Sequence, residues 1–304
     1  MTLHDSILSG DRRALARLIT KIENDQPESR AALAALYPRG GRAQVIGVTG
    51  APGTGKSTLV SEMAKAYRRA AKTVAIIAVD PTSPFTGGAI LGDRIRMRDL
   101  SGDDGVFIRS MATRGSLGGL ARATDEVVAV VDAAGFDVIM IETVGAGQSE
   151  VDIARLAHTT LVVEAPGLGD DVQAIKAGIL EIADVLVLNK ADLPGAEAAT
   201  RALRGMLMLA HTQWDVPICE TVAAEGKGVA EVIAAIDRHR NYLLQNDGMI
   251  QRERDRVRRQ LENLARDLLY SRFIAAKRDE VDAAIEAVAS RQRDPYSVVD
   301  ELLK

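Results

Sequence analysis

The 304-residue sequence predicts an α/β fold, a mainly parallel sheet flanked by helices, with a helical extension at each end. Between residues 44 and about 240, continuous runs of Val, Ile and Leu alternate with helical patterns, as expected for strands covered on both faces. Outside this region, apolar residues recur only at helical spacing. We therefore expect an N-terminal helical segment 1–43, a central sheet domain 44–240 and a C-terminal helical extension 241–304.

Seven strands are expected, near residues 44–49, 73–79, 105–109, 137–142, 159–164, 184–189 and 216–220. Ligands of parallel α/β sheets bind at the carboxyl ends of the strands. Polar residues follow three of the predicted strands: Asp80, Glu142 and the pair Asn189-Lys190. The sequence therefore predicts a ligand site at this edge of the sheet.

A glycine-rich loop follows the first predicted strand and precedes a helical pattern, which is the context of a phosphate-binding P-loop NTPase motif. Backbone N–H groups of such a loop, together with the helix N-terminus, bind the phosphates of a nucleoside triphosphate. The Lys56 ammonium would reach the β- and γ-phosphates, and the Ser57 hydroxyl would bind Mg²⁺. The predicted cofactor-binding loop comprises Gly50, Ala51, Pro52, Gly53, Thr54, Gly55, Lys56, Ser57 and Thr58.

A second motif, Asn189-Lys190-Ala191-Asp192, follows a buried apolar run in the same α/β pattern. The Asp192 carboxylate only accepts hydrogen bonds, and guanine offers it two N–H donors that adenine lacks. An unmatched buried polar group costs about 1–3 kcal/mol, so Asp192 predicts selection of guanine. We expect Asn189, Lys190 and Asp192 to bind the base, with backbone amides of Ala223 and Ala224 near the guanine carbonyl.

Glu142-Thr143-Val144-Gly145 ends another predicted strand. The Glu142 carboxylate suits Mg²⁺, directly or through water, and the Gly145 N–H suits the γ-phosphate. In Ras-type GTPases the next residue is a Gln that orients the attacking water, whereas here it is Ala146. Slow intrinsic hydrolysis is therefore expected unless another segment or a partner completes the site.

Two long loops add further candidates. Asp80 and Asp93 flank a loop rich in Pro, Gly and Thr, and both are candidate Mg²⁺ ligands, although Asp93 also suits a helix N-cap. The second loop, 166–176, leads into a helix and carries Lys176, which is either an ordinary surface lysine or a catalytic group at the nucleotide.

The two terminal segments read as amphipathic helices. The first is expected to cap the sheet domain or, alternatively, to bind a partner. In the last, the charged run 251–259 reads as a solvated helix face, with a binding surface as the alternative, and Asp294-Pro295 reads as a helix start. An extension too small for its own core packs on something else, often a second copy, so a homodimer is expected.

Composition excludes several classes of function. The net charge of −4 and the 3% of aromatic residues disfavour nucleic-acid binding. The single cysteine, Cys219, excludes an intramolecular disulfide and is expected to be buried in a strand. Neither a signal peptide nor a membrane-spanning run is visible, so a cytoplasmic protein without a membrane partner is expected.

Together these motifs resemble the MeaB/ArgK family of SIMIBI-class P-loop GTPases, which includes the methylmalonic aciduria type A protein. The similarity runs from about Gly47 to Ala230. Its most specific stretches are residues 86–93, 108–110, 115–119, 141–150 and 173–178. Family members are G-protein chaperones that gate cofactor loading of adenosylcobalamin-dependent acyl-CoA mutases and protect them.

The resemblance implies Mg²⁺ contacts from Ser57, Asp80, Asp93 and Glu142, and a homodimer joined through helical extensions. It also implies a switch loop at 166–176, in which Asp170 and Lys176 couple the nucleotide state to the mutase. The stretches 109–115 and 166–172 depart from the family forms associated with methylmalonyl-CoA mutase. A different acyl-CoA mutase is therefore an open alternative.

The function expected from all of this is GTP hydrolysis, using GTP/GDP and Mg²⁺, slow alone and stimulated by a mutase partner. Two alternatives remain: a P-loop kinase of the old arginine/ornithine-transport type, and a metal-delivery GTPase chaperone. The sequence shows no separate acceptor-binding domain for the first. Four scattered histidines and one cysteine disfavour the second.

Overall fold

The structure, a computed structural model, describes residues 2–81, 97–100, 102–113, 119–143, 149–167, 181–208 and 213–304. The chain forms two compact units, residues 1–256 and 257–304, and the division falls within helix α11, Gly248–Ala276. No helix among these residues is long and apolar enough to cross a bilayer. The predicted boundaries near 43 and 240 stay predictions.

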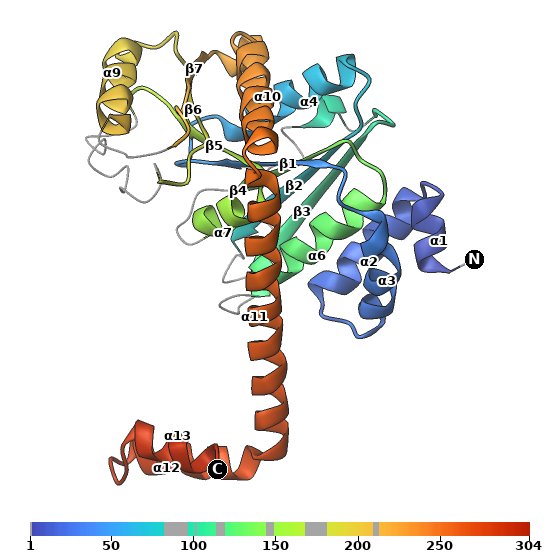
Figure 1. Cartoon of the computed structure of the whole chain (residues 1–304), viewed down its shortest axis with the longest axis vertical. Coiled ribbons are helices and arrows are strands. Elements are labelled where there is room, and N and C mark those ends of the chain that lie inside the picture. The colour runs from blue at the N-terminus through green and yellow to red at the C-terminus, as the bar shows by residue number, and fades with distance from the viewer. Residues whose placement is uncertain are drawn as a thin grey trace. The chain divides into compact units, whose positions relative to one another are not determined.

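The predicted parallel sheet is confirmed. In the part of the chain that the structure describes, it contains seven strands in the order β3-β2-β4-β1-β5-β6-β7, all parallel (Figure 1). The strands are β1 Gln44–Thr49, β2 Val74–Pro81, β3 Val106–Thr113, β4 Val138–Thr143, β5 Thr159–Glu164, β6 Val185–Asn189 and β7 Ile218–Thr221. Each lies within a few residues of its expected place, because buried parallel strands are encoded locally as apolar runs.

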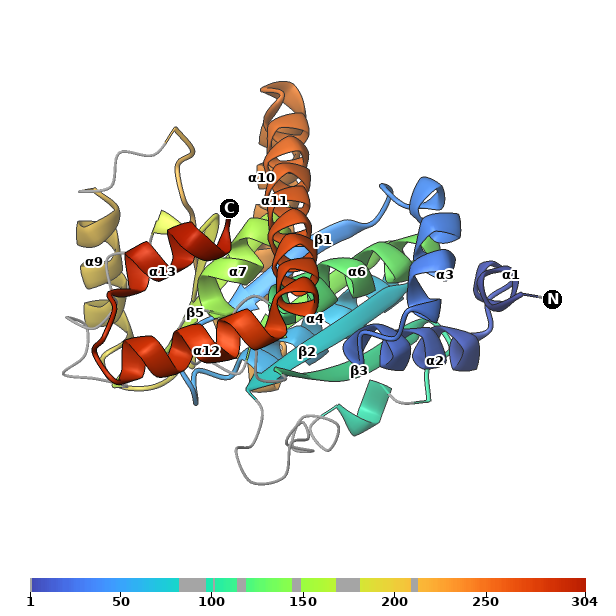
Figure 2. The ribbon, with the colours of Figure 1, turned by 90° about the horizontal axis from the view of Figure 1, so that it is seen from below.

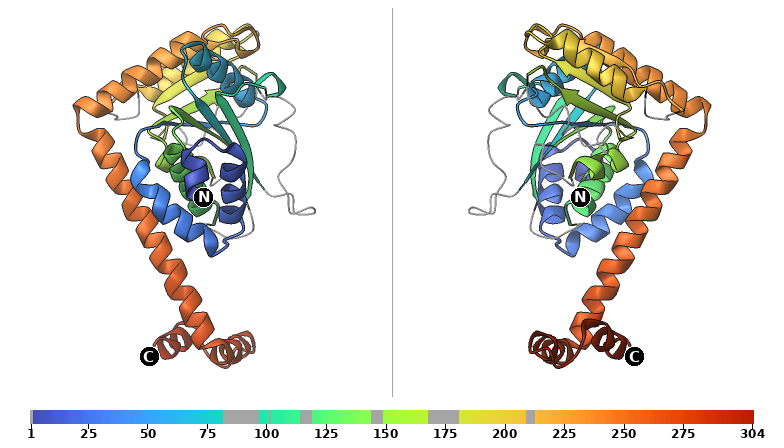
Figure 3. Two further views of the ribbon diagram at one scale, coloured as in Figure 1. Left: turned by 90° about the vertical axis from the view of Figure 1, so that its right-hand side faces the viewer. Right: turned by 90° about the vertical axis from the view of Figure 1, so that its left-hand side faces the viewer.

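Helices cover both faces of the sheet, and alternate residues of each strand point to opposite layers. Val45 of β1 packs with α6 and α7, whereas the next residue, Ile46, packs with α4 and α10 (Figures 1 and 3). A smaller cluster joins β6 to α9. The bounds are α4 Lys56–Arg69, α6 Gly119–Ala133, α7 Ser149–Leu156, α9 Ala196–Leu207 and α10 Val229–Gln245, with short 3₁₀ turns at η2 Arg98–Leu100 and η4 Ala223–Glu225.

The N-terminal helices belong to the same core, as expected for a cap on the sheet domain. They are α1 Leu3–Leu8, α2 Arg12–Glu23 and α3 Glu28–Leu36, followed by the 3₁₀ turn η1 Tyr37–Arg39. Leu15, Leu18, Ile19 and Ile22 form the buried face of α2. The helix packs against α6 and β3 (Figure 2). Arg109 of β3 forms an ion pair with Glu23 of α2, so one residue of the stretch 109–115, which departs from the family form, is engaged within the domain.

The charged run 251–259 was expected to be a solvated helix face, and this prediction is wrong in part. Arg252 donates two hydrogen bonds to the Asp184 carboxylate, at 2.9 and 2.6 Å, and Arg256 lies 3.7 Å from the Asp125 carboxylate. Arg254 is exposed, as predicted. The first turns of α11 are therefore tied to the sheet domain through pairs that lie far apart in the sequence.

The second unit consists of the remainder of α11 with α12, Arg278–Ala289, and α13, Pro295–Leu302. Asp294 caps α13 by accepting a hydrogen bond from the Ser297 N–H, and Pro295 takes the first helical position, as predicted. These helices line an apolar groove of about 700 Å³. Cys219 lies buried in β7, also as predicted.

Candidate nucleotide site

The predicted nucleotide loop follows β1, at the point where the order of the strands reverses. Strand β1 lies between β4 and β5, with β2 and β3 beyond β4 and with β6 and β7 beyond β5. Loops that leave neighbouring strands in opposite directions open a crevice at this place, which is where parallel sheets bind ligands. The loop 50–55 and the first turn of α4 occupy its centre.

Two glycines allow this loop its path. Gly50 has φ 137°, and a Cβ there would lie 2.1 Å from the Val163 carbonyl oxygen of β5. Gly55 has φ 92°, and a Cβ there would lie 2.3 Å from Nδ2 of Asn189. Since no side chain fits in either place, glycine lets the backbone pass close to β5 and β6. The chain then enters α4 by its N-terminus, where backbone N–H groups can bind an anion.

The Lys56 ammonium lies inside the loop. Its Nζ donates to the carbonyl oxygens of Gly50 at 2.7 Å and Ala51 at 2.9 Å, and the residue is 6% exposed. Thr54 is buried, and its hydroxyl also donates to the Ala51 carbonyl. A cation held this way at a helix N-terminus gives the loop a positive field that suits phosphate. Pro52, Gly53 and Thr58 are exposed around it.

Ser57 and Glu142 meet at the base of the loop. The Ser57 hydroxyl donates to Oε1 of Glu142 at 2.5 Å, and the two residues are 8% and 1% exposed. Beside them, the Thr143 hydroxyl donates to the Thr49 hydroxyl at 3.0 Å and so joins the ends of β4 and β1. A hydroxyl and a carboxylate oxygen held together are the donor types that Mg²⁺ prefers.

Asn189 links the two predicted halves of the site. Its side chain donates from Nδ2 to the Thr54 carbonyl at 2.8 Å, and its Oδ1 accepts from the Thr221 hydroxyl and the Ala223 N–H, both at 3.0 Å. It is 3% exposed. Sequence reasoning assigned Asn189 to the base and missed these bonds, because no local pattern indicates a partner 135 residues away. The structure shows that it holds the P-loop against the loop after β7.

The remaining predicted base residues lie around this joint. Lys190 donates from Nζ to the Gly53 carbonyl at 2.8 Å, and Asp192 is exposed. Ala223 is buried and Ala224 is exposed, in the 3₁₀ turn η4. A hydrogen bond to Glu225 raises the pKa of Lys227, and the Asp192 charge adds to that shift. Next to Asp192, the Ala191 N–H donates to the Thr221 carbonyl at 3.0 Å, so this loop lies beside the loop after β7.

Several residues that the sequence singled out lie outside the described part of the chain: Asp93, Gly145, Ala146, Asp170 and Lys176. Asp80 lies in β2, but its side chain is also outside that part. Within the described residues, no group of three or more His, Cys, Asp or Glu side chains could hold a metal ion. The described part of the candidate site thus consists of the loop 50–58, Glu142 and the loops after β6 and β7.

A parallel sheet with a P-loop after its central strand, joined to an Asn-Lys-x-Asp loop, defines a P-loop GTPase. A family model described as "Methylmalonyl Co-A mutase-associated GTPase MeaB" matches residues 15–278. The chain belongs to this MeaB family, and it is a GTPase that binds guanine nucleotides.

Known relatives agree with this assignment. A protein of Pyrococcus abyssi is 48% identical over 99% of this chain and 95% of its own length. The GTPase ArgK of Escherichia coli is 38% identical over 77% of this chain and 75% of its own. A methylmalonic aciduria type A homolog of Caenorhabditis elegans is 32% identical over 89% of this chain and 73% of its own.

A solved structure described as a LAO/AO transport system kinase is similar in fold over nearly the whole chain. It superposes with a TM-score of 0.74 at 26% identity and covers 99% of this chain and 95% of its own. The resemblance to the MeaB/ArgK family and the α/β P-loop fold are thereby confirmed.

Proposed function

We propose that this GTPase is a regulatory G-protein chaperone in the cytoplasm. It gates cofactor loading of an adenosylcobalamin-dependent acyl-CoA mutase, methylmalonyl-CoA mutase or a related isomerase, and protects that enzyme. The hydrogen bonds of Asn189 carry the nucleotide part of this proposal, since they hold the P-loop beside the loop after β7, which we propose to bind the base. The family description, a GTPase associated with methylmalonyl-CoA mutase, supports the partner.

In the proposed reaction, water attacks the γ-phosphate in line with the bond to the leaving GDP. The Lys56 ammonium leaves its carbonyl partners in the loop and turns to the β- and γ-phosphates, where it neutralises charge that builds up in the transition state. Backbone N–H groups of residues 50–58 hold the phosphates. The Gly145 N–H is proposed to bind the γ-phosphate, with Lys176 a further catalytic candidate.

The buried pair Ser57–Glu142 fits Mg²⁺ by the chemistry of its oxygens. We propose that Ser57 and Glu142 hold the ion, with Asp80 and Asp93 as further ligands. When bound, Mg²⁺ would neutralise charge on the β- and γ-phosphate oxygens. Glu142 is nearly fully buried, so a carboxylate there needs a cation or a donor beside it, and Ser57 is the donor that the structure shows.

The base part of the proposal gives each residue of the second motif a role. Asp192 accepts from the guanine N–H groups, and Ala223 and Ala224 lie at the guanine carbonyl. Lys190, held at the Gly53 carbonyl, covers the nucleotide from the side of the phosphate loop. Because Asp192 is exposed, binding of a base would desolvate this carboxylate and make a mismatched base costly.

We further propose that the protein is a homodimer through its C-terminal unit. The apolar groove of residues 257–304 leaves large side chains in water: Leu269, Tyr270 and Ile285 are 65%, 64% and 58% exposed. A continuous apolar surface of this kind is typical of an association site. Two helical units of equal shape can cover each other's grooves by two-fold symmetry.

One experiment tests the function directly. GTP hydrolysis by the full chain is measured alone and with a panel of purified adenosylcobalamin-dependent acyl-CoA mutases, in Mg²⁺. We expect slow turnover alone, because Ala146 stands where Ras-type GTPases have a Gln, and faster turnover with the cognate mutase. If no mutase in the panel binds the protein or accelerates hydrolysis, the chaperone proposal fails while the GTPase assignment stands.

Two variants separate the parts of the site in the same assay. Lys56→Ala should lose GTP hydrolysis, and Asp192→Asn should weaken GTP binding and admit xanthosine triphosphate. Unchanged hydrolysis by the first variant, or unchanged preference for guanine in the second, contradicts the role proposed for that residue.

A further inference from the structure

Two buried threonines connect β1 and β4 at the edge of the sheet that carries the nucleotide loop. The Thr143 hydroxyl donates to the Thr49 hydroxyl at 3.0 Å, and both residues are 0% exposed. Thr49 is the last residue of β1 and directly precedes Gly50 of the P-loop. Thr143 is the last residue of β4 and directly follows Glu142. This hydroxyl bond therefore links the residue before the phosphate loop to the residue after the buried carboxylate.

The bond lies one residue beyond the backbone pairing of the two strands. The register between β1 and β4 ends at the pair Val48–Glu142. At the next position Thr49 pairs with β5 and Thr143 pairs with β2. Because the ends of structural elements open more easily than their middles, a side-chain bond here holds β4 to β1 where the pairing is weakest.

Thr143 and Glu142 point to opposite faces of the sheet, because side chains alternate along a strand. Glu142 lies on the α4 side, where its carboxylate accepts from Ser57. Thr143 shares its face with Ile141, which belongs to the core cluster with α6 and α7. The threonine pair thus lies on the other side of the sheet from the Ser57–Glu142 pair, and a change in it reaches the carboxylate through the backbone of the strand.

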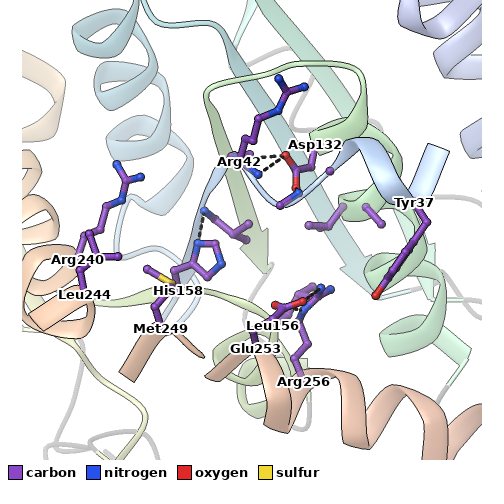
Figure 4. Close-up of a pocket in the computed structure, with 16 residues that line it drawn as sticks. Tyr37, Arg42, Asp132, Leu156, His158, Arg240, Leu244, Met249, Glu253 and Arg256 are labelled. Carbon is purple, nitrogen blue, oxygen red and sulfur yellow. Dashed lines mark hydrogen bonds and ion pairs between the residues drawn. The ribbon is translucent and has the colours of Figure 1, made fainter. Parts of the chain in front are cut away.

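The other end of β1 is fixed by different side chains. The Val45 N–H donates to Nδ1 of His158 at 3.1 Å (Figure 4). The Asp132 carboxylate accepts from the N–H groups of Arg42 at 3.1 Å and Ala43 at 2.9 Å, beside a cavity of about 420 Å³. Strand β1 is thus anchored independently of the threonine pair, so Thr49 is a fixed point from which the end of β4 can be positioned.

The Glu142 carboxylate needs a fixed position for the role proposed above, since Mg²⁺ binds its oxygen ligands at short distances and in near-ideal octahedral geometry. Groups that orient a metal ligand without touching the metal contribute strongly to metal affinity. We infer that Thr49 and Thr143 are a positioning pair, whose hydroxyl bond holds the end of β4 so that Glu142 can bind Mg²⁺ beside Ser57. This inference rests on the proposed Mg²⁺ site and adds two residues that bind neither the ion nor the nucleotide.

The test measures metal affinity and not turnover. Mn²⁺, an octahedral ion that also prefers oxygen ligands, is titrated into the GDP-bound full chain, and free Mn²⁺ is followed by electron paramagnetic resonance. Thr143→Val keeps the size of the side chain and removes the hydroxyl. We expect it to weaken Mn²⁺ binding about fivefold, the equivalent of one hydrogen bond. GDP affinity in EDTA should change less than about twofold, and Thr143→Ser, which keeps the hydroxyl, should bind Mn²⁺ within about twofold of wild type.

A second variant breaks the same bond from the other strand. Thr49→Val removes the acceptor and should weaken Mn²⁺ binding about as much as Thr143→Val does. The double variant should also lose about fivefold, because both single changes remove one shared interaction. Losses that multiply in the double variant would show that the two threonines act separately, which overturns the inference.

Controls separate this inference from the metal site on which it rests. Thr160→Val should leave both affinities unchanged, because Thr160 is 1% exposed and its hydroxyl has no hydrogen-bond partner among the described residues. Glu142→Gln should weaken Mn²⁺ binding at least about tenfold. If Glu142→Gln does so and Thr143→Val does not, the positioning inference fails and the proposed metal site stands. If Glu142→Gln has no effect, both fail. An equal loss in Thr143→Ser, or a matching loss of GDP affinity in EDTA, shows a general structural role and also overturns the inference.

Discussion

The bonds of Asn189 predict that one buried amide supports both stability and nucleotide affinity. Asn189→Ala removes a side chain that pairs with the Thr54 carbonyl, the Thr221 hydroxyl and the Ala223 N–H. All of these contacts are buried, so water does not replace the lost partner without cost. The phosphate loop and the loop after β7 would then no longer be joined by hydrogen bonds to one side chain.

The magnitude follows from the count of contacts. Three hydrogen bonds at about 1 kcal/mol each give a loss of roughly 3 kcal/mol in the free energy of unfolding. For a domain of this size, that loss corresponds to a decrease of about 6–12 °C in the thermal midpoint. GDP affinity should fall about tenfold as well, since binding must then order the two loops that Asn189 holds in place.

The assay is thermal and urea unfolding of the nucleotide-free protein, with fluorescent GDP binding measured on the same samples. Asn246→Ala is the matched control, because Asn246 makes one exposed hydrogen bond to the Tyr242 carbonyl at the end of α10. It should cost well under about 1 kcal/mol and leave GDP binding unchanged. If Asn189→Ala unfolds at the same midpoint as this control and binds GDP normally, the joint between the loops has no energetic role.

Three other predictions concern positions at which the structure determines whether a change raises or lowers stability or GDP affinity. Gly50→Ala should abolish GDP binding, whereas Gly53→Ala, whose new Cβ would meet nothing within 4 Å, should weaken it only modestly through its φ of 82°. Burial lowers the pKa of His239 from 6.5 to about 4, so the unfolded chain takes up a proton at a higher pH than the folded protein does. As the pH falls from 6.5 to 4, the free energy of unfolding measured with urea should therefore decrease by on the order of 1–3 kcal/mol. The decrease should be smaller in His239→Gln. Arg252→Ala should cost about 1.5–3 kcal/mol by removing its charge-assisted hydrogen bonds from Asp184, which keeps the Thr160 N–H, and a calorimetric midpoint equal to wild type would contradict this.

The strands were predictable from sequence because their information is local. Residues 185–188 are apolar on both faces whatever the rest of the chain does, and the same holds for 45–48 and 138–141. The P-loop and the Asn-Lys-x-Asp motif are equally local, since each is a contiguous stretch whose residue types and spacing indicate its function.

Contacts between distant segments were not predictable. The charged run 251–259 has the composition of a solvated face, and nothing within it shows that Arg252 reaches Asp184. The same reason explains why the bond from Asn189 to Thr54 was missed: it depends on β5 alone separating β1 from β6, which is a property of the strand order. The periodicity of a sequence shows which residues share one face of a helix or strand, whereas the order of the strands determines which distant residues come into contact.

Strand β6 has a contact to α11 at its start and a contact to the nucleotide loops at its end. Asp184, just before it, anchors α11 through Arg252, and Asn189 at its other end joins the two nucleotide loops. The strand between them is buried at every position, and tightly packed interiors deform little. We therefore expect the strand to stay in one conformation when a nucleotide binds. For this reason Arg252→Ala should lower stability with GDP affinity unchanged, whereas Asn189→Ala should lower both. Equal losses of GDP affinity in the two variants would show that the strand couples its ends.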